Sequence, residues 1–321
     1  MTILFCSVGR RAELLKNVRK SMGKDGRIIA TDMTNTAPAL YFADAYHVVP
    51  AITDPTYIDV ILDVCRKENV DVISTCIDPE IMLLAKHRED FKKLGILVLT
   101  PMEETAKLCF DKYCMYCYLR EHGIPTVQTY GDLTSFENAY TDGAISFPVF
   151  VKPRTGSGSV GARIIHTIMD LQVAFNTEPD LIVQEYMGNA LDLDADVYID
   201  TVSHEVVSIF TKQKLETKIG GASKTISFKD SKLVEFLINS LKPFSFNGPI
   251  DVDVFYRDGR YFLSEINPRF GGAYLHAFGA GVDFIQMIQQ NVNGLANTPA
   301  FMAYEEGIAM LMYDSVVVCK V

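Results

Sequence analysis

The stretch YFLSEINPR at residues 261–269, which follows IDVDVFY at 250–256 across a short turn, decides how this sequence is interpreted. Both arms are rich in β-branched and aromatic residues, which is typical of two antiparallel strands. Glu265 and Asn267 are two residues apart, so in an extended chain they point to the same face. Carboxylate and amide oxygens are the ligands that Mg²⁺ prefers. The sequence therefore predicts a hairpin with a magnesium site on one face.

The register of this hairpin tests the metal hypothesis. A two-residue loop at 258–259 would pair Val252 with Glu265 and put Asp251 and Asp253 on the opposite face. A three-residue loop, with its glycine at the left-handed bulge position, pairs Asp251 with Glu265 and brings Asp253 diagonally adjacent. The metal hypothesis predicts the three-residue loop and leaves open whether Asp251 or Asp253 is the third ligand. The alternative is a solvated polar strand face without a metal.

A glycine-rich segment, GSGSVG at 156–161, lies between predicted strands at 147–151 and 162–166. The pattern G-x-G-x-x-G is a weak signal by itself, and a dinucleotide fingerprint needs a helix after the loop. A strand follows here, which predicts a flap whose backbone N–H groups cover phosphates. Lys152 stands just before the loop and can offer a point charge to a phosphate. The alternative is an ordinary hairpin tip with a solvated lysine.

Composition sets the limits within which these motifs are interpreted. The 321 residues include 30 Lys and Arg against 40 Asp and Glu, a formal net charge of −10. The length predicts about two domains. The acidic balance argues against binding of duplex nucleic acid, and no apolar run approaches the roughly 18 residues of a membrane span. Seven scattered cysteines do not suggest a disulfide framework. We therefore expect a cytoplasmic protein without a nucleic-acid or membrane partner.

The first hundred residues alternate strand and helix patterns. Strands are predicted at 3–8, 27–32, 71–76 and 96–99, with a further one ending at Pro50, and helices at 12–22, 57–68 and 80–94. This alternation predicts a doubly wound parallel sheet. Ligands of such sheets bind beyond the carboxyl ends of the strands. Arg10 and Arg11 follow the first strand, so they are candidate substrate contacts; the alternative is that both are solvated.

The pattern changes near Pro101. A helix is predicted over 103–123, strands dominate from Phe147 onward, and helices are predicted at 232–241 and 283–294. This strand-rich part is of the α+β class and follows an α/β N-terminal domain. The apolar run at 315–319 predicts an edge strand that a second subunit covers, so a homodimer is the expected assembly.

Together these motifs resemble the ATP-grasp superfamily, most closely proteins described as carbamoyl-phosphate-synthase large-subunit-like. The resemblance is carried by Asp111-Lys112, by the strand and glycine loop around Lys152, by QEYMG at 184–188 and by EINPR at 265–269. It implies a Rossmann-like preATP-grasp domain over 1–101, followed by a two-lobed ATP-grasp domain. Its linker helix and small lid lobe would span 102–187, and its large lobe with the magnesium site would span 188–321.

The resemblance also implies roles for the matched residues. The ATP-binding residues would be Lys112, Lys152, Gly156, Ser157, Gly158, Gly161, Glu185, Tyr186, Met187 and Asp192. The metal ligands would be Asp253, Glu265 and Asn267, and the catalytic residues would be Arg269 and Lys152. Arg10, Arg11, Lys214 and His276 are candidate substrate contacts. Two positions depart from the family pattern, because Asp192 replaces the commoner glutamate and Asp253 replaces a glutamine or glutamate.

The activity that the resemblance implies is ligation of a small-molecule carboxylate to an amine or related nucleophile. ATP and Mg²⁺, or Mn²⁺ in its place, would support this reaction through an acyl phosphate, with release of ADP and phosphate. Two alternatives stay open: a non-catalytic regulatory module that binds Mg-ATP, and carboxyl phosphorylation of the carbamoyl-phosphate-synthase type. The chain is long enough for one ATP-grasp unit, whereas the familiar large subunit contains two.

Overall fold

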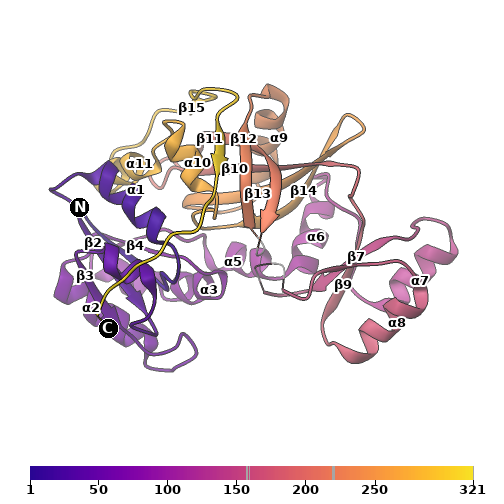
Figure 1. Ribbon diagram of the computed structural model, residues 1–321, viewed down its shortest axis with the longest axis horizontal. Helices are drawn as coiled ribbons and strands as arrows, with labels where there is room; N and C mark the ends of the chain where they lie inside the picture. Colours follow the sequence, from indigo (N-terminus) through magenta and orange to yellow (C-terminus); the bar gives the residue numbers. More distant parts are fainter. Residues whose placement is uncertain (157, 159, 219–220, 321) are drawn as a thin grey trace.

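The strands of the chain form three sheets that follow one another along the sequence (Figure 1). The computed structural model describes residues 1–156, 158, 160–218 and 221–320. Within this part, the first sheet belongs to an N-terminal domain, the second to a small lobe and the third to a large lobe. Figure 1 shows the large lobe between the other two. No helix of the described residues is both long and apolar enough to cross a membrane.

The N-terminal sheet is parallel throughout, as the sequence predicts. Its strand order is β3 (Ala45–Val48), β2 (Arg27–Asp32), β1 (Thr2–Cys6), β4 (Val72–Thr75) and β5 (Leu97–Val98). The other elements of this domain are α1 (Ala12–Met22), η1 (Pro38–Phe42), α2 (Tyr57–Glu68), α3 (Asp78–Lys86) and α4 (Arg88–Lys93). The helix predicted at 80–94 is divided at His87, which belongs to neither piece.

The small lobe is an antiparallel sheet with two helices packed against it. Its strand order is β6 (Thr129–Tyr130), β9 (Leu181–Glu185), β7 (Val149–Pro153) and β8 (Arg163–Ile165), and its helices are α7 (Leu133–Thr141) and α8 (Ile168–Thr177). Phe136 from α7 and Leu171 from α8 join Val149 and Val151 in one buried cluster. The glycine loop joins antiparallel β7 and β8, which confirms the predicted strand–loop–strand arrangement.

The large lobe is built on the third sheet. Its strand order is β14 (Arg260–Asn267), β13 (Gly248–Arg257), β10 (Leu191–Ile199), β11 (Val206–Lys218), β12 (Gly221–Ser227) and β16 (Ala309–Leu311), and β15 (Ala300–Phe301) pairs with β11. Its helices are α9 (Ser231–Leu241), α10 (Tyr274–Gly279) and α11 (Phe284–Val292).

The helix predicted over 103–123 is two helices, α5 (Glu103–Phe110) and α6 (Lys112–Glu121). The break falls at Asp111, whose backbone is extended. Its carboxylate accepts hydrogen bonds from the backbone N–H groups of Tyr113 and Cys114, at 3.1 and 2.9 Å. An aspartate in this position caps a new helix, so it starts α6 instead of continuing α5.

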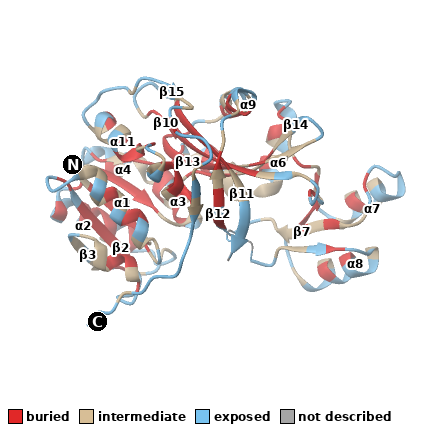
Figure 2. Cartoon of the chain, turned by 45° about the horizontal axis from the view of Figure 1, so that its top comes forward, coloured by how far each residue is buried: buried red, intermediate tan, exposed pale blue. Residues whose placement is uncertain are grey.

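The C-terminal segment is not part of a sheet within this chain. Residues 312–320 form no strand here, and the pairing of 315–319 with a second subunit stays a prediction. Val316 and Val318 are 84% and 94% exposed, and Figure 2 shows this segment as an exposed stretch of chain that returns toward the N-terminal domain.

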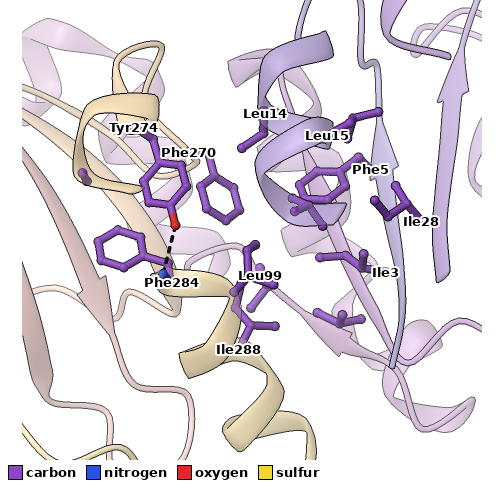
Figure 3. Close-up of a cluster of buried hydrophobic side chains, with 14 of the residues drawn as sticks. Ile3, Phe5, Leu14, Leu15, Ile28, Leu99, Phe270, Tyr274, Phe284 and Ile288 are labelled. Carbon is purple, nitrogen blue, oxygen red and sulfur yellow. Dashed lines mark hydrogen bonds between the residues drawn. The ribbon is translucent and has the colours of Figure 1, made fainter. Parts of the chain in front are cut away.

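The N-terminal domain and the large lobe share one hydrophobic core (Figure 3). Phe5 from β1 packs against Phe270, with ring centroids 6.0 Å apart. Tyr274 stacks on Phe284, and its hydroxyl accepts a hydrogen bond from the Phe284 backbone N–H at 2.9 Å. This shared core fixes the carboxyl ends of β1 and β4 beside the turn that follows β14.

Candidate functional site

The turn of the β13–β14 hairpin is tight. Asp258 and Gly259 form a two-residue loop, because Arg257 pairs with Arg260. Both loop residues have positive φ, at 52° and 77°, as this kind of hairpin turn requires. The three-residue loop that the metal hypothesis predicted is therefore wrong.

A bulge in β14 nevertheless produces the alignment that the metal hypothesis needs. The register shifts between Asp253 and Val254, and Ser264 is left without a partner. Asp253 therefore lies opposite Glu265, and Asp251 lies opposite Asn267. An extra residue in one strand moves the residues beyond it to the other face. All four polar side chains thus share one face of the sheet.

The neighbouring strand β10 extends this polar face. Asp194 lies opposite Asp253 and Asp196 lies opposite Asp251, while Asp192 shares their face two residues away. Sequence analysis singled out Asp192 but missed Asp194 and Asp196. The signal was available, because an aspartate at every second position of a strand marks one polar face.

Two lysines of β11 balance these aspartates. Lys212 is fully buried, with its Nζ 3.0 Å from Asp194 Oδ1 and in a further ion pair with Asp196. Lys214 Nζ lies 3.2 Å from Asp192 Oδ1 and also pairs with Asp253. Burial opposes charging of Lys214, but its two aspartates outweigh burial and raise its pKa. Lys214 therefore stays protonated at neutral pH.

Two more lysines reach the site from the small lobe and its linker. Lys152, near the end of β7, has its Nζ 3.6 Å from Glu265 Oε2. Lys112, the first residue of α6, donates to the Gly156 carbonyl at 2.5 Å. Burial and the nearby Lys152 lower the pKa of Lys112. Two like charges are thus held next to the glycine loop, where an anion would relieve their repulsion.

Two arginines border the site on the side of the N-terminal domain. Arg269 Nε donates to Asp78 Oδ1 at 2.9 Å, and Asp78 begins α3 just beyond β4. Arg11 donates to the carbonyls of Phe270 and Gly271, at 2.6 and 3.1 Å. Asp78 was missed by the sequence analysis, although the carboxyl end of β4 was expected to face a ligand.

Most of these side chains line one cavity of about 510 Å³ between the lobes, whereas Asp192, Asp196 and Lys212 do not. Of the predicted site residues, its lining includes Lys112, Lys152, Gly156, Gly158, Asp253, Glu265, Asn267, Arg269, Arg11 and Lys214, together with Asp251. Gly161, Glu185, Tyr186, Met187, Asp192, Arg10 and His276 are not part of that lining. Ser157 lies outside the described residues. The cavity therefore gathers the predicted phosphate and metal residues, but not the predicted adenine and ribose residues.

The predicted adenine hinge lies where the small lobe joins the large one. Glu185 ends β9, and its carboxylate accepts a hydrogen bond from Arg257 at 2.6 Å. Met187 is buried and Tyr186 is 38% exposed. The Glu185 backbone N–H donates to the Gln128 carbonyl, and the Met187 carbonyl accepts from the Ala190 N–H, each at 2.9 Å.

Two predicted substrate contacts lie elsewhere. Arg10 is exposed on the turn after β1. His276 is buried in α10, where Nδ1 lies 2.7 Å from Thr225 Oγ1 and Nε2 lies 2.9 Å from the Ile308 carbonyl. Burial lowers the pKa of His276 to about 4. Both ring nitrogens are occupied, so His276 joins structural elements and does not face the cavity.

The donor set fits Mg²⁺ in its chemistry. The carboxylates of Asp253 and Glu265 and the amide of Asn267 are hard oxygen ligands on one face. In the described residues, no three His, Cys, Asp or Glu side chains already converge as a ligand set. Lys214 and Lys152 hold the two carboxylates instead. A divalent cation bound here would have to displace Lys152 from Glu265 and Lys214 from Asp253.

The chain thus has a parallel N-terminal sheet, a small lobe with a glycine loop and a large lobe whose sheet carries aspartates on one face. This is an α/β protein with a cavity between two lobes that is lined by charged side chains. Residues 3–99 match the family model "PylC-like, N-terminal domain", and residues 109–273 match the family model "ATP-grasp domain". The second match covers more than half of the chain, and the chain belongs to the ATP-grasp family. The narrower likeness to carbamoyl-phosphate synthases stays a prediction.

Individual relatives agree with this assignment. The chain is 28% identical over 142 residues to D-alanine–D-alanine ligase A of Bacillus cereus, which is 40% of this chain and 47% of that one. The chain spans less than half the length of the first curated relatives it matches. N5-carboxyaminoimidazole synthetase from Staphylococcus aureus, solved with ADP, has a TM-score of 0.73 at 18% identity, over 94% of this chain and 79% of that one.

A third relative is the biotin carboxylase domain of the Hydrogenobacter thermophilus 2-oxoglutarate carboxylase, solved with MgADP, ADP and bicarbonate. Its TM-score is 0.70 at 18% identity, over 95% of this chain and 71% of that one. At these identities the two solved structures establish the fold.

Proposed function

We propose that this protein is an ATP-dependent ligase that joins a carboxylate to an amine or related nucleophile through an acyl phosphate, releasing ADP and phosphate. The observation that carries the proposal is the single cavity in which Lys112, Lys152 and Arg269 face Asp253 and Glu265. Cations for phosphate oxygens and hard ligands for a metal meet there. Membership of the ATP-grasp family and the likeness to D-alanine–D-alanine ligase support the same reaction class.

Phosphoryl transfer needs positioning and positive charge more than it needs a protein nucleophile. Lys152 and Lys112 stand beside the glycine loop, where they would bind the phosphates of ATP. Arg269 would steady the acyl phosphate from the opposite side. The glycine loop would close over the reacting groups and keep water from the intermediate.

Asp253, Glu265 and Asn267 would hold Mg²⁺, or Mn²⁺ in its place. The bound cation would supply positive charge to the phosphate oxygens. Asp251, whose side chain lies next to Asn267, is the alternative third ligand. When nucleotide and metal bind, Lys152 and Lys214 would exchange Glu265 and Asp253 for phosphate oxygens.

The contacts to adenine and ribose would come from the segment that joins the small lobe to the large lobe. The backbone of Glu185, Tyr186 and Met187 would bind adenine, and Asp192 would reach the ribose. A cytoplasmic location suits the seven free cysteines. A homodimer would cover the apolar run at 315–319, which is exposed in the single chain.

The test is a screen that works before the substrate is identified. The protein is incubated with ATP, Mg²⁺, single carboxylic acids and hydroxylamine, which converts an acyl phosphate into a hydroxamate. We expect ADP, phosphate and hydroxamate to form together with at least one acid. Formation of AMP and pyrophosphate would contradict the proposal, and nucleotide binding without turnover would favour the regulatory module.

The matched control is Glu265→Gln, which keeps the size of the side chain and removes its charge. We expect turnover to fall by about 100-fold or more, since losing even an outer partner of a metal ligand costs about 10- to 100-fold. Full activity of this variant at the same Mg²⁺ concentration would show that the metal assignment is wrong.

A further inference from the structure

Arg11 lines the cavity as a cation that no carboxylate neutralises. Its Nη2 and Nη1 atoms donate to the carbonyls of Phe270 and Gly271, at 2.6 and 3.1 Å. These bonds use only part of the donors of a guanidinium group, and carbonyl oxygens carry no net charge. None of the described carboxylates forms an ion pair with Arg11. A charge that is partly removed from water is stabilised by an opposite charge, so an anion is expected from outside the described chain.

A second cation lies next to Arg11. Arg269 Nη1 donates to the Phe270 carbonyl at 3.1 Å, so the two guanidinium groups share one acceptor. Asp78 accepts from Arg269 at 2.9 Å, and Asp251 lies 3.9 Å from it, so both carboxylates are placed against Arg269. Burial and the charge of Arg269 lower the pKa of Arg11. An anion bound to Arg11 would offset the repulsion between the two cations.

Space for such an anion lies beside Arg11 Nη1. Gly272 also lines the cavity, and a Cβ atom on it would meet only Arg11 Nη1, at 3.6 Å. The glycine has no left-handed φ that would explain its identity. Its missing side chain instead leaves open space against the guanidinium group. The cavity therefore reaches Arg11 without any movement of the turn after β14.

The position of Arg11 shows which substrate the anion belongs to. Among the described residues, two cations that line the cavity have no ion pair, Lys112 and Arg11. Lys112 lies beside the glycine loop of the small lobe, where the proposed function puts the phosphates of ATP. Arg11 comes from the N-terminal domain, on the other side of the large lobe (Figure 1). Its neighbour Arg269 would steady the acyl phosphate, so an anion at Arg11 lies next to the reacting carboxylate of the acid.

We propose that the acid substrate is a dicarboxylate, in which Arg269 receives the carboxylate that becomes phosphorylated and Arg11 binds a second carboxylate that does not react. This inference rests on the proposed ligase function and names the class of its acid. The planar guanidinium group matches the geometry of a carboxylate and forms stronger hydrogen bonds with it than with a neutral acceptor. A monocarboxylic acid would leave Arg11 without a counter-charge beside Arg269.

The test measures hydroxamate formation, which needs no amine substrate. Succinate, glutarate, aspartate and glutamate are compared with succinamate, glutaramate, asparagine and glutamine, in which one carboxylate is replaced by an amide of similar size. We expect at least one diacid to have a KM about 10- to 100-fold below that of its monoamide, as expected for a hydrogen bond between charged groups.

Arg11→Gln removes the positive charge and keeps an amide that can donate to the turn after β14. We expect the preference for the diacid over its monoamide to fall about 10- to 100-fold in this variant. If Arg11 only held the turn, both KM values would rise equally and the preference would not change. Arg10→Gln is the matched control, because Arg10 is exposed on the same turn and lies outside the cavity lining. It should keep the preference of wild type.

A pair of glycine variants tests the geometry independently. Gly272→Ala puts a methyl group 3.6 Å from Arg11 Nη1, in the space proposed for the second carboxylate. It should raise the KM for the diacid more than the KM for the monoamide. Gly279→Ala is the control, because a Cβ atom there would meet nothing within 4 Å. Thermal melting of each variant confirms that it is folded, so the glycine pair remains decisive if Arg11→Gln is unstable.

The outcomes separate this proposal from the proposed function. Absence of hydroxamate with every acid overturns the ligase and the dicarboxylate together. Hydroxamate formation with equal KM values for each diacid and its monoamide overturns the dicarboxylate alone. An equal loss for both acids in Arg11→Gln also overturns it, because Arg11 would then act on the turn or on the reacting carboxylate. A loss confined to reactions with an amine acceptor would assign Arg11 to the second substrate and overturn the proposal as well.

Discussion

At the scale of single residues, the site consists of opposite charges that hold one another in place. Lys152 lies 3.6 Å from Glu265, and Lys214 pairs with Asp253. Each of these two predicted metal ligands is thus kept in position by a lysine that the proposed mechanism assigns to phosphate. In the proposed mechanism, the same lysines and carboxylates would become available to ATP and Mg²⁺ when these bind together.

Lys152→Met should weaken nucleotide binding without unfolding the protein. The variant keeps the apolar stem and removes one charge-assisted hydrogen bond, which is worth roughly 1.5–3 kcal/mol. We therefore expect the Kd for ADP with Mg²⁺, measured by calorimetry, to rise about 10- to 100-fold. Lys24→Met, on an exposed turn, is the control and should bind normally. Equal affinities in the two variants would contradict the role of Lys152.

Some site residues could be predicted from local sequence and others could not. Glu265 and Asn267 are two residues apart on a strand, so their common face follows from strand geometry. Asp78 meets Arg269 across 191 positions of sequence, and nothing near Asp78 signals this contact. Asp196 is intermediate, because the alternating aspartates of β10 were visible but their partners on β11 and β13 were not.

At the scale of elements, the sequence predicted regular segments well and their interruptions poorly. The predicted bounds of α1, α2 and β2 agree with the structure residue for residue. The bulge at Ser264 was missed, because its position depends on which face of β14 meets the core and which meets the cavity. The break at Asp111 follows from its capping bonds, which a preference for aspartate before a helix could have suggested.

The buried histidine of α10 makes stability depend on pH. Burial lowers the pKa of His276 to about 4 from an ordinary value of 6.5, so the fold favours the neutral ring. Above about pH 6.5 the ring is neutral in both the folded and the unfolded protein, so it does not affect stability. As the pH falls from 6.5 toward 4, the unfolded protein takes up the proton first, and the free energy of unfolding decreases. We expect the urea midpoint of wild type to fall across this interval.

His276→Gln is the variant that isolates this effect, because its amide can still donate to the Ile308 carbonyl. Its urea midpoint should fall less than that of wild type between about pH 6.5 and 4.5, since the variant has no ring to protonate. If the urea midpoints of both proteins fell equally with pH, a group other than His276 would be responsible.

At the scale of the whole molecule, the N-terminal domain is part of the site and not an appendage. It contributes to the core around Phe5 and Phe270, and it supplies Asp78 to Arg269. Despite burial, Asp78 and Asp251 raise the pKa of Arg269. The order of the domains could be inferred from the motifs. The shared core could not, because an apolar pattern shows that a face is buried but not which other element covers it.

Asp78→Asn should therefore destabilise the protein as a whole. Arg269 would lose its closest partner and keep only Asp251, 3.9 Å away. Breaking a well-buried pair in this way costs up to roughly 3–5 kcal/mol. We expect a clear fall in the thermal midpoint. Asp90→Asn, which breaks partly exposed pairs with Lys93 and His87, is the control and should cost less than about 1 kcal/mol. Similar midpoints for both variants would mean that the Asp78–Arg269 pair does not hold the domains together.

The β13–β14 hairpin determines which parts of the molecule are held at a fixed distance from each other. One end of the hairpin carries Glu265 and Asn267. At the other end Arg257 donates a hydrogen bond to Glu185, the last residue of β9 in the small lobe. Paired β-strands are stiff along their length, so the hairpin holds Glu185 at a fixed distance from Glu265 and Asn267. The hairpin therefore links the segment at Glu185 directly to the strand that carries Glu265 and Asn267.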